Sequence, residues 1–498
     1  MLAACSIRVA LKAEQPDKKQ DQQIDSVYLY LSKYGQHVNS IDIPAGLGRS
    51  LFSLVELPEN MCRLKNFTAR DVGLQLQPGY GCQGMLHAGM PLQQLCLASC
   101  DLLDGDEGLA AALSLLPDLQ HLSITECASD GRYMGVICSD VVYSLQQLTF
   151  LELAYCAVQD VHGLRHLTAL QDLRLLLFNE CTVDSSVLSG SQQLTFLQLH
   201  SANVSVIIRP AVLAGKTQLQ HLSVGCSIDG GSAGVTELLS HLQHMQQLTY
   251  LDLSYSLKAT APAAAYSALT ASSSLQWLDV RDCAVPAGVW QHVFPSGRLM
   301  PHLRVLHVAD VHSPEGPVAA PAGSRLVSCC PGLQALNMQC LQYSSELLAP
   351  LTGLTSLQQL RLLHDNSSAE GLEVVCKLTG VKWLELDLPD DAGELLLQLT
   401  QLQQLTYFHY RGGMDGEYFE EWCSLKVGCL AMLPVFDPAK SVLAIAVVLV
   451  LSASMSLIEP CTTSSLRSLL LGSVAYGYCC NPATGRCKCL YSCQCCCC

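Results

Sequence analysis

One short frame, Leu-x-x-Leu-x-Leu, recurs along most of this chain and constrains its fold more than any other feature. A clear copy is LTFLELAYCAV from Leu148, and the next, LQDLRLLLF, begins 22 residues later at Leu170. Copies start 22 to 30 residues apart, and a nearly constant period of this length is typical of a repeat architecture. About 15 copies are present, beginning at Val38, Leu64, Leu92, Leu119, Leu148, Leu170, Leu194, Leu219, Leu248, Leu275, Leu303, Leu333, Leu357, Val381 and Leu405.

Each copy predicts a short strand followed by a segment that covers it. The last two Leu of the frame alternate at period two, as a strand with one buried face requires. The residues between frames carry a second apolar set at helical spacing, for example over 109–116 and 347–351. A unit of this size cannot bury its own apolar side, so neighbouring units must stack. With 50% hydrophobic and 14% charged residues, the chain is neither a collagen, nor a coiled coil, nor largely disordered.

These frames resemble the leucine-rich-repeat family over residues 38–413. The repeat length and a recurrent Cys after the strand look like the long, helix-containing class, which includes ribonuclease inhibitor and the substrate-binding arms of F-box proteins. The Gln-rich wording is similar to uncharacterised repeat proteins of green algae. The resemblance implies an α/β solenoid curved into a horseshoe, with a parallel sheet on the concave face and helices on the convex face. It also implies that the Cys side chains bond neighbouring backbone inside the turn at Cys100, Cys127, Cys156 and Cys283.

The N-terminal end differs from the repeat region. Residues 1–37 are predicted to form a cap or a degenerate repeat, with a strand over 5–11 and an amphipathic helix over 22–34. The repeats are expected to occupy 38–413.

The C-terminal end shows two further changes of composition, after a flank at 414–440. Residues 441–458 hold 18 uncharged residues, close to the lower limit for a membrane span. They are predicted either to span a membrane or to form a hydrophobic capping helix. The tail at 459–498 is Cys-rich and of low complexity, which fits an S-acylated tail, a metal-binding tract or an incorrectly predicted gene end.

Catalytic motifs are absent from the sequence. It contains no His-Glu-x-x-His pair and no phosphate-binding loop. His162 and His166 lie four residues apart, a spacing that a solvated helix face explains better than a zinc site. We therefore expect no enzyme, no cofactor and no metal, and the net charge of −15 argues against a nucleic-acid partner.

The strand residues that point away from the core form the candidate site. Six repeats carry a large aromatic residue two positions after the first residue of the frame, and charged residues follow two and four positions later. Aromatic side chains beside mixed charges are typical of protein-binding hot spots. Tyr250 and Trp277 are expected to be neighbours on adjacent strands. The predicted partner-binding residues are Phe150, Glu152, Phe196, Tyr250, Asp252, Trp277, Asp279, Arg281, Trp383, Glu385 and Tyr407.

The sequence thus predicts a non-catalytic scaffold that binds an unknown protein on the concave face. Three alternatives stay open: a substrate-recognition subunit of an F-box-type ubiquitin ligase, a membrane-tethered adaptor or receptor held by 441–458, and a ciliary or cytoskeletal scaffold component. Residues 1–10 lack the basic start and uninterrupted apolar run of a secretion signal. We therefore expect a cytoplasmic location, including the cytoskeleton or the cilium axoneme, with a membrane location as the alternative.

Overall fold

The computed structural model divides the chain into two compact units, Met1–Pro434 and Val435–Cys498. Every residue that the structure describes belongs to the first unit, so the segments predicted at 441–458 and 459–498 lie outside the described residues. The described residues are 5–8, 29–43, 53–54, 57–58, 60–74, 76, 86–87, 89–102, 105–129, 132–133, 136–137, 139–158, 161–177, 181–201, 206–313, 316–317, 320–340, 345–364, 372–387, 398–399, 401–411 and 431–432.

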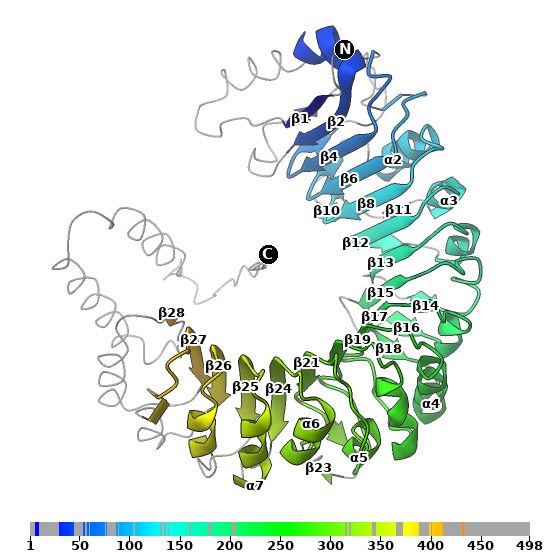
Figure 1. Cartoon of the computed structure of the whole chain (residues 1–498). Helices are drawn as coiled ribbons and strands as arrows, with labels where there is room; N and C mark the ends of the chain where they lie inside the picture. Colours follow the sequence, from blue (N-terminus) through cyan, green and yellow to red (C-terminus); the bar gives the residue numbers. More distant parts are fainter. Residues whose placement is uncertain are drawn as a thin grey trace, which may run out of the picture. The chain divides into compact units, whose positions relative to one another are not determined.

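Parallel strands form one eighteen-stranded sheet, in which each repeat pairs with the next one along the chain (Figure 1). All fifteen predicted frames form strands of this sheet, which confirms the α/β solenoid. The strands are β1 (Cys5–Arg8), β2 (Val38–Ile43), β4 (Asn66–Arg70), β6 (Gln94–Ala98), β8 (His121–Thr125), β11 (Val136–Ile137), β12 (Phe150–Val158), β13 (Asp172–Leu177), β15 (Phe196–Ser201), β17 (His221–Gly225), β19 (Tyr250–Asp252), β20 (Trp277–Asp279), β21 (Val305–Val308), β24 (Ala335–Cys340), β25 (Gln359–His364), β26 (Trp383–Asp387), β27 (Tyr407–Arg411) and β28 (Ala431–Met432).

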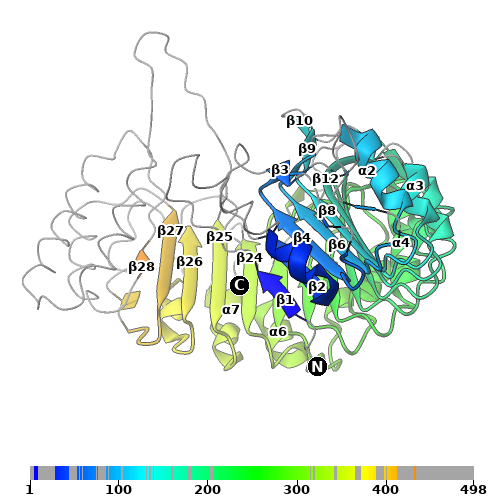
Figure 2. The same ribbon diagram turned by 90° about the horizontal axis from the view of Figure 1, so that it is seen from above.

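Helices lie on the outer side of this unit and the sheet lines its inner side (Figures 1 and 2). Their length differs between repeats. The 27-residue repeat from Leu92 holds α2, and the 29-residue repeat from Leu219 holds α4. The 22-residue repeat from Leu148 and the 25-residue repeat from Leu194 hold the short 3-10 helices η2 and η3, because a shorter segment leaves room for a tighter turn only. The helices are α2 (Gly105–Ser114), α3 (Ser139–Ser144), η2 (His162–His166), η3 (Pro210–Leu213), α4 (Gly231–Leu242), η4 (Ala263–Thr270), α5 (Trp290–Val293), α6 (Gly323–Cys329), α7 (Ser345–Leu348), η5 (Ala349–Gly353) and η6 (Leu372–Lys377).

The edges of the repeat region extend the sheet on both sides. In the predicted cap, β1 pairs in parallel with β2. Residues 29–34 are helical, and the 3-10 helix η1 (Gly35–His37) follows them. In the predicted flank, β28 pairs in parallel with β27. Within the described part of the chain, no helix is both long and apolar enough to cross a membrane.

Three small sheets lie beside the main one, formed by short segments that follow its strands. The first contains β3 (Ser53–Leu54), β5 (Gly73–Leu74), β7 (Asp101–Leu102), β9 (Ala128–Ser129) and β10 (Arg132–Tyr133). The second contains β14 (Cys181–Val183), β16 (Val206–Ile208) and β18 (Ser227–Ile228), and the third pairs β22 (His312–Ser313) with β23 (Gly316–Pro317).

The Leu residues of the frames form the buried core. Several of the turns that follow the strands share one backbone conformation. Among the described residues, seven at this turn have a positive φ of 52° to 64° although none is Gly. The buried thiols of the following Cys residues donate to a carbonyl of the preceding repeat, as in Cys127 to Leu97 at 3.6 Å and Cys283 to Leu253 at 3.0 Å. Cys100 bonds Ala69 in the same way at 3.4 Å. The structural role predicted for these thiols is confirmed, while the side chain of Cys156 lies outside the described residues.

Candidate functional site

The six predicted aromatic residues share one row across the inner face of the sheet. Phe150 and Phe196 are both in register with Asp172, and Tyr250 is directly opposite Trp277. Further along the same row, Trp383 is opposite Tyr407. In-register neighbours of a parallel sheet lie about 4.8 Å apart, so flat side chains in one row can stack.

Part of this row, together with Arg174 and His307 from the adjacent row, forms a continuous stack, which we call the ring ladder: His121, Phe150, Arg174, Phe196, His221, Tyr250, Trp277 and His307. The ring centroids of Phe196 and His221 are 3.8 Å apart, and those of His221 and Tyr250 are 3.9 Å apart. Tyr250 stacks on Trp277 at 5.3 Å, and Trp277 meets His307 edge-on at 5.0 Å. The ladder therefore runs without a break from β8 to β21.

Arg174 fills the one place between His121 and Trp277 where the row lacks a ring. Asp172 stands there, and it binds the guanidinium of Arg174 through two hydrogen bonds of 3.1 and 3.0 Å. The guanidinium carbon lies 5.1 Å from the ring centroid of Phe150 and 4.4 Å from that of Phe196. A flat cation between two aromatic faces continues the stack by cation–π attraction.

Sequence reasoning missed the three imidazoles of the ladder, His121, His221 and His307. His121 and His221 stand two positions after the first residue of their frames, which is the position of the six predicted aromatic residues. Applying the same register to every flat side chain, rather than to Phe, Tyr and Trp alone, identifies these two.

Beside the ladder, the predicted carboxylates are held in ion pairs and hydrogen bonds. Asp279 is 1% exposed, and it accepts from Arg281 at 2.7 Å and contacts Nδ1 of His307 at 3.1 Å. Burial alone raises the pKa of Asp279, but hydrogen bonds from His307 and Arg281 outweigh it and hold that pKa below its usual value. Arg281 is partly exposed, so it offers the partner more surface than Asp279 does.

The same arrangement recurs at the other end of the sheet. The buried carboxylate of Glu385 lies 3.1 Å from Nε of Arg361 and 3.4 Å from Nδ1 of His409. A buried carboxylate that is shared by one Arg and one His thus appears at β20–β21 and again at β25–β27.

The carboxylates of Asp252 and Glu152 accept hydrogen bonds from serine hydroxyl groups of the preceding repeat. Ser223 donates to Asp252 at 3.0 Å and contacts Nε2 of His200 at 2.7 Å, while Ser123 donates to Glu152 at 2.6 Å. Because the single hydroxyl proton of Ser223 goes to Asp252, His200 acts as donor to the serine rather than as a base that would activate it. The hydrogen bonds among His200, Ser223 and Asp252 therefore differ from those of a catalytic triad, in which the serine donates to the histidine.

Burial shifts the pKa values of three imidazoles and one phenol on this face. It lowers the pKa of His221 to about 4, with Arg174 and His200 acting in the same direction. Burial also lowers the pKa values of His121 and His200, and it raises the pKa of Tyr250 to about 12. At pH 7 the ring of His221, in the middle of the ladder, is therefore uncharged.

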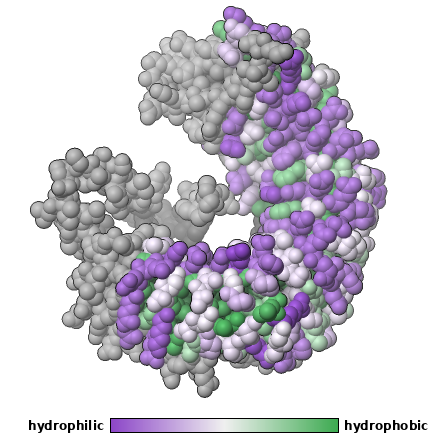
Figure 3. All heavy atoms as spheres, in the orientation of Figure 1, coloured by the Kyte–Doolittle hydropathy of each residue, from purple (hydrophilic) through white to green (hydrophobic). Residues whose placement is uncertain are grey.

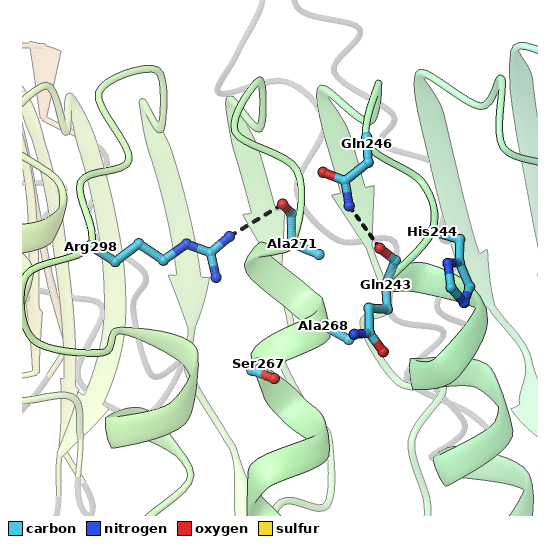
Figure 4. Close-up of a pocket in the computed structure, with 7 residues that line it drawn as sticks. All are labelled: Gln243, His244, Gln246, Ser267, Ala268, Ala271 and Arg298. Carbon is cyan, nitrogen blue, oxygen red and sulfur yellow. Dashed lines mark hydrogen bonds between the residues drawn. The ribbon is translucent and has the colours of Figure 1, made fainter.

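A polar pocket of about 320 Å³ lies on the outer side, between the end of α4 and η4 (Figure 4). Gln243, His244 and Arg298 are among its seven lining residues. One nitrogen of Arg298 donates to the carbonyls of Thr270 and Ala271, so the guanidinium closes the end of η4. None of the predicted site residues lines this pocket.

On the face in view in Figure 3, hydrophilic residues predominate, with small hydrophobic patches between them. In the part of the chain that the structure describes, no group of three or more His, Cys, Asp or Glu residues is arranged to hold a metal ion.

Comparison with known proteins identifies similar solved structures. The sequence itself matches no family model and no curated protein. An internalin from Listeria monocytogenes is 16% identical, with 73% of this chain and 85% of that chain covered and a TM-score of 0.38. A TDR receptor is 15% identical, with 82% and 70% covered and a TM-score of 0.49. The leucine-rich-repeat ectodomain of the Arabidopsis receptor kinase HAESA, in complex with a peptide hormone, is 16% identical, with 82% and 69% covered and a TM-score of 0.45.

Proposed function

We propose that this protein is a non-catalytic scaffold that binds another protein on the inner face of its sheet, with the ring ladder at the centre of the interface. The observation that carries this proposal is the unbroken stack from His121 on β8 to His307 on β21. Its aromatic rings are half-buried rather than sealed, so each keeps some surface for a partner.

The ladder has properties that favour tight binding of a protein partner. Each ring inside the ladder is fixed by its neighbours on both sides, so little conformational entropy is lost when a partner docks. Trp, Tyr and Arg are the residue types that most often dominate interfaces, and Arg174, Tyr250 and Trp277 all belong to the ladder. The ladder backs onto buried frame residues and not onto a cavity, which favours a macromolecular partner over a small molecule.

The double substitution Tyr250→Ala with Trp277→Ala tests this function. Both rings lie on the inner face, opposite the buried Leu251 and Leu278, so the fold should survive. Removing a hot spot of this kind costs at least ~2 kcal/mol of binding, or about thirtyfold in affinity. Affinity capture from the source cells with mass spectrometry identifies the partner, and calorimetric titration then measures the dissociation constant for both proteins.

Leu299→Ala is the matched control, since Leu299 is a large exposed apolar residue outside the ladder. It should bind the captured partner like the wild type. An unchanged dissociation constant for the double variant, with a wild-type melting curve, would rule out the ladder as the site. A double variant that does not fold would instead show that the two rings support the core.

The same capture separates the wider alternatives. Cullin adaptors among the captured proteins would indicate a ubiquitin-ligase subunit, and axonemal proteins a ciliary scaffold. We include a cytoplasmic location in the proposal, and imaging of the tagged protein distinguishes it from a membrane or cilium location.

A further inference from the structure

The row that carries the ring ladder contains a ring-free interval, which we define as Val305, Ala335 and Gln359. These residues occupy β21, β24 and β25, and they lie in register between Trp277 on β20 and Trp383 on β26. Four strand spacings separate the two indoles, which corresponds to about 19 Å along the sheet. Two of the four Trp residues of the chain therefore border a stretch of smaller side chains.

A primary amide beside this interval has no hydrogen-bond partner within the described residues. Asn337 lies in register between His307 and Arg361, and its side chain is 95% buried, being only 5% exposed. The Oδ1 atom of Asn337 is buried and has no hydrogen-bond partner among the described residues, and the same is true of Nε1 of Trp277. Buried polar groups without partners are rare in native proteins, and they mark places where a ligand or a water completes the structure.

The charges around Asn337 are already balanced. Arg361 pairs with Glu385 at 3.1 Å, and His307 pairs with Asp279, which also binds Arg281. An incoming cation or anion would find each opposite charge already engaged, and it would lose its own hydration without compensation. An uncharged group that forms hydrogen bonds avoids this penalty.

We infer that the ring-free interval receives an uncharged amide side chain, Asn or Gln, from the docking segment of a partner protein, and that this amide pairs with Asn337. An amide carries both donors and an acceptor, so it complements Asn337 in either orientation of the Asn337 side chain. The inference rests on the proposed function, because it assigns chemistry to one position of the same face.

The test uses peptides selected from a phage-displayed library of random dodecapeptides on the full chain. Dissociation constants of the synthesised peptides are then measured for the wild type, Asn337→Leu, Ala335→Trp and the control Gln94→Trp. Ala335→Trp fills the interval, whereas Gln94 stands in the same row on β6, away from it. Asn337→Leu keeps the number and branching of the side-chain heavy atoms and removes the amide, so the inference does not depend on whether Ala335→Trp folds.

The selected peptides should share one Asn or Gln position with no charged residue beside it. Their affinity should fall about tenfold with Asn337→Leu and be unaffected by Gln94→Trp. Replacing the shared peptide amide by Leu should cost affinity for the wild type and almost none for Asn337→Leu, which shows that the two amides are coupled.

Three results would overturn the inference. Peptides that lose affinity for the Tyr250→Ala, Trp277→Ala protein but bind Asn337→Leu normally would contradict it and leave the proposed function standing. Peptides whose affinity is unchanged by all of these substitutions would contradict both the inference and the proposed function. A failure to enrich any peptide over an uncoated surface would also count against the amide site, because a dodecapeptide is long enough to cover the interval.

Discussion

At the scale of single residues, buried polar groups in this protein bridge one repeat to the next. The hydroxyl of Ser272 donates to the carbonyl of Leu248, and the thiol of Cys283 donates to that of Leu253. Lys216 does the same with a charged group: it is 3% exposed, and Nζ donates to the carbonyls of Leu188 at 2.7 Å and Ser191 at 3.0 Å. These bonds satisfy backbone groups that the strands cannot reach.

Lys216→Ala should therefore lower the free energy of unfolding by about 2 kcal/mol, because two buried carbonyls lose their donor. Urea denaturation followed by circular dichroism measures the change. Lys258→Ala, at an exposed position, is the control and should stay within about 0.5 kcal/mol of the wild type. Equal midpoints for the two variants would contradict the bridging role of Lys216.

His221 should make stability depend on pH in the acid range. Its pKa is about 4 in the folded protein and about 6.5 in an unfolded chain, so between these values the unfolded state binds more protons. Stability is complete above about pH 6.5 and falls as the pH is lowered to about 4, with a slope from this group of at most about 1.4 kcal/mol per pH unit. His221→Phe, which keeps the stack, should show a shallower fall in denaturant titrations at pH 4 to 7, and an identical fall would exclude His221 as the cause.

At the scale of elements, the segments that cover the sheet differ from one repeat to the next. A spacing of 29 residues accommodates α4, and a spacing of 22 residues accommodates only η2. The start of α4 is formed by two Gly residues with positive φ, Gly230 at 82° and Gly231 at 56°, which turn the chain away from β18. The helix then packs its Leu238 and Leu242 against the core.

Gly234→Ala should destabilise this element although Ala favours helices elsewhere. A Cβ atom at Gly234 would overlap the carbonyl oxygen of Asp229, so the first turn of α4 would have to move. We expect a loss of about 1–3 kcal/mol in the free energy of unfolding. Ser240→Ala, at an exposed position of the same helix, should be neutral or slightly stabilising, and a Gly234→Ala protein of equal stability would show that the turn adapts at no cost.

At the scale of the whole molecule, each repeat contacts chiefly its two neighbours, as the strand pairing from β2 to β28 shows. Stability in such an array is close to a sum of repeat and nearest-neighbour contributions. Local damage is therefore expected to spread over adjacent repeats before it reaches distant ones.

Leu278→Ala should demonstrate this spread. Leu278 is fully buried on β20, and truncating it removes core contacts worth about 2–5 kcal/mol. Hydrogen–deuterium exchange should accelerate most in β19, β20 and β21, and least in β4. Trp277→Ala, on the opposite face of the same strand, is the control and should leave this pattern unchanged. Uniform acceleration along the sheet would mean that the repeats unfold as one unit.

The sequence by itself determined the solenoid, the fifteen strands and the row that holds Tyr250, Trp277 and Trp383, because the period of the frame sets which side chains are buried. Only the tertiary structure decided what stacks on what. His121 and His221 complete the ladder through in-register contacts between different repeats, and Arg174 completes it from the adjacent row. The carboxylates of Asp279 and Glu385 are buried, and they pair with His307 and His409 of neighbouring strands. Such contacts join residues some 20 to 30 positions apart, and they depend on the distances and angles between strands, which no single repeat encodes.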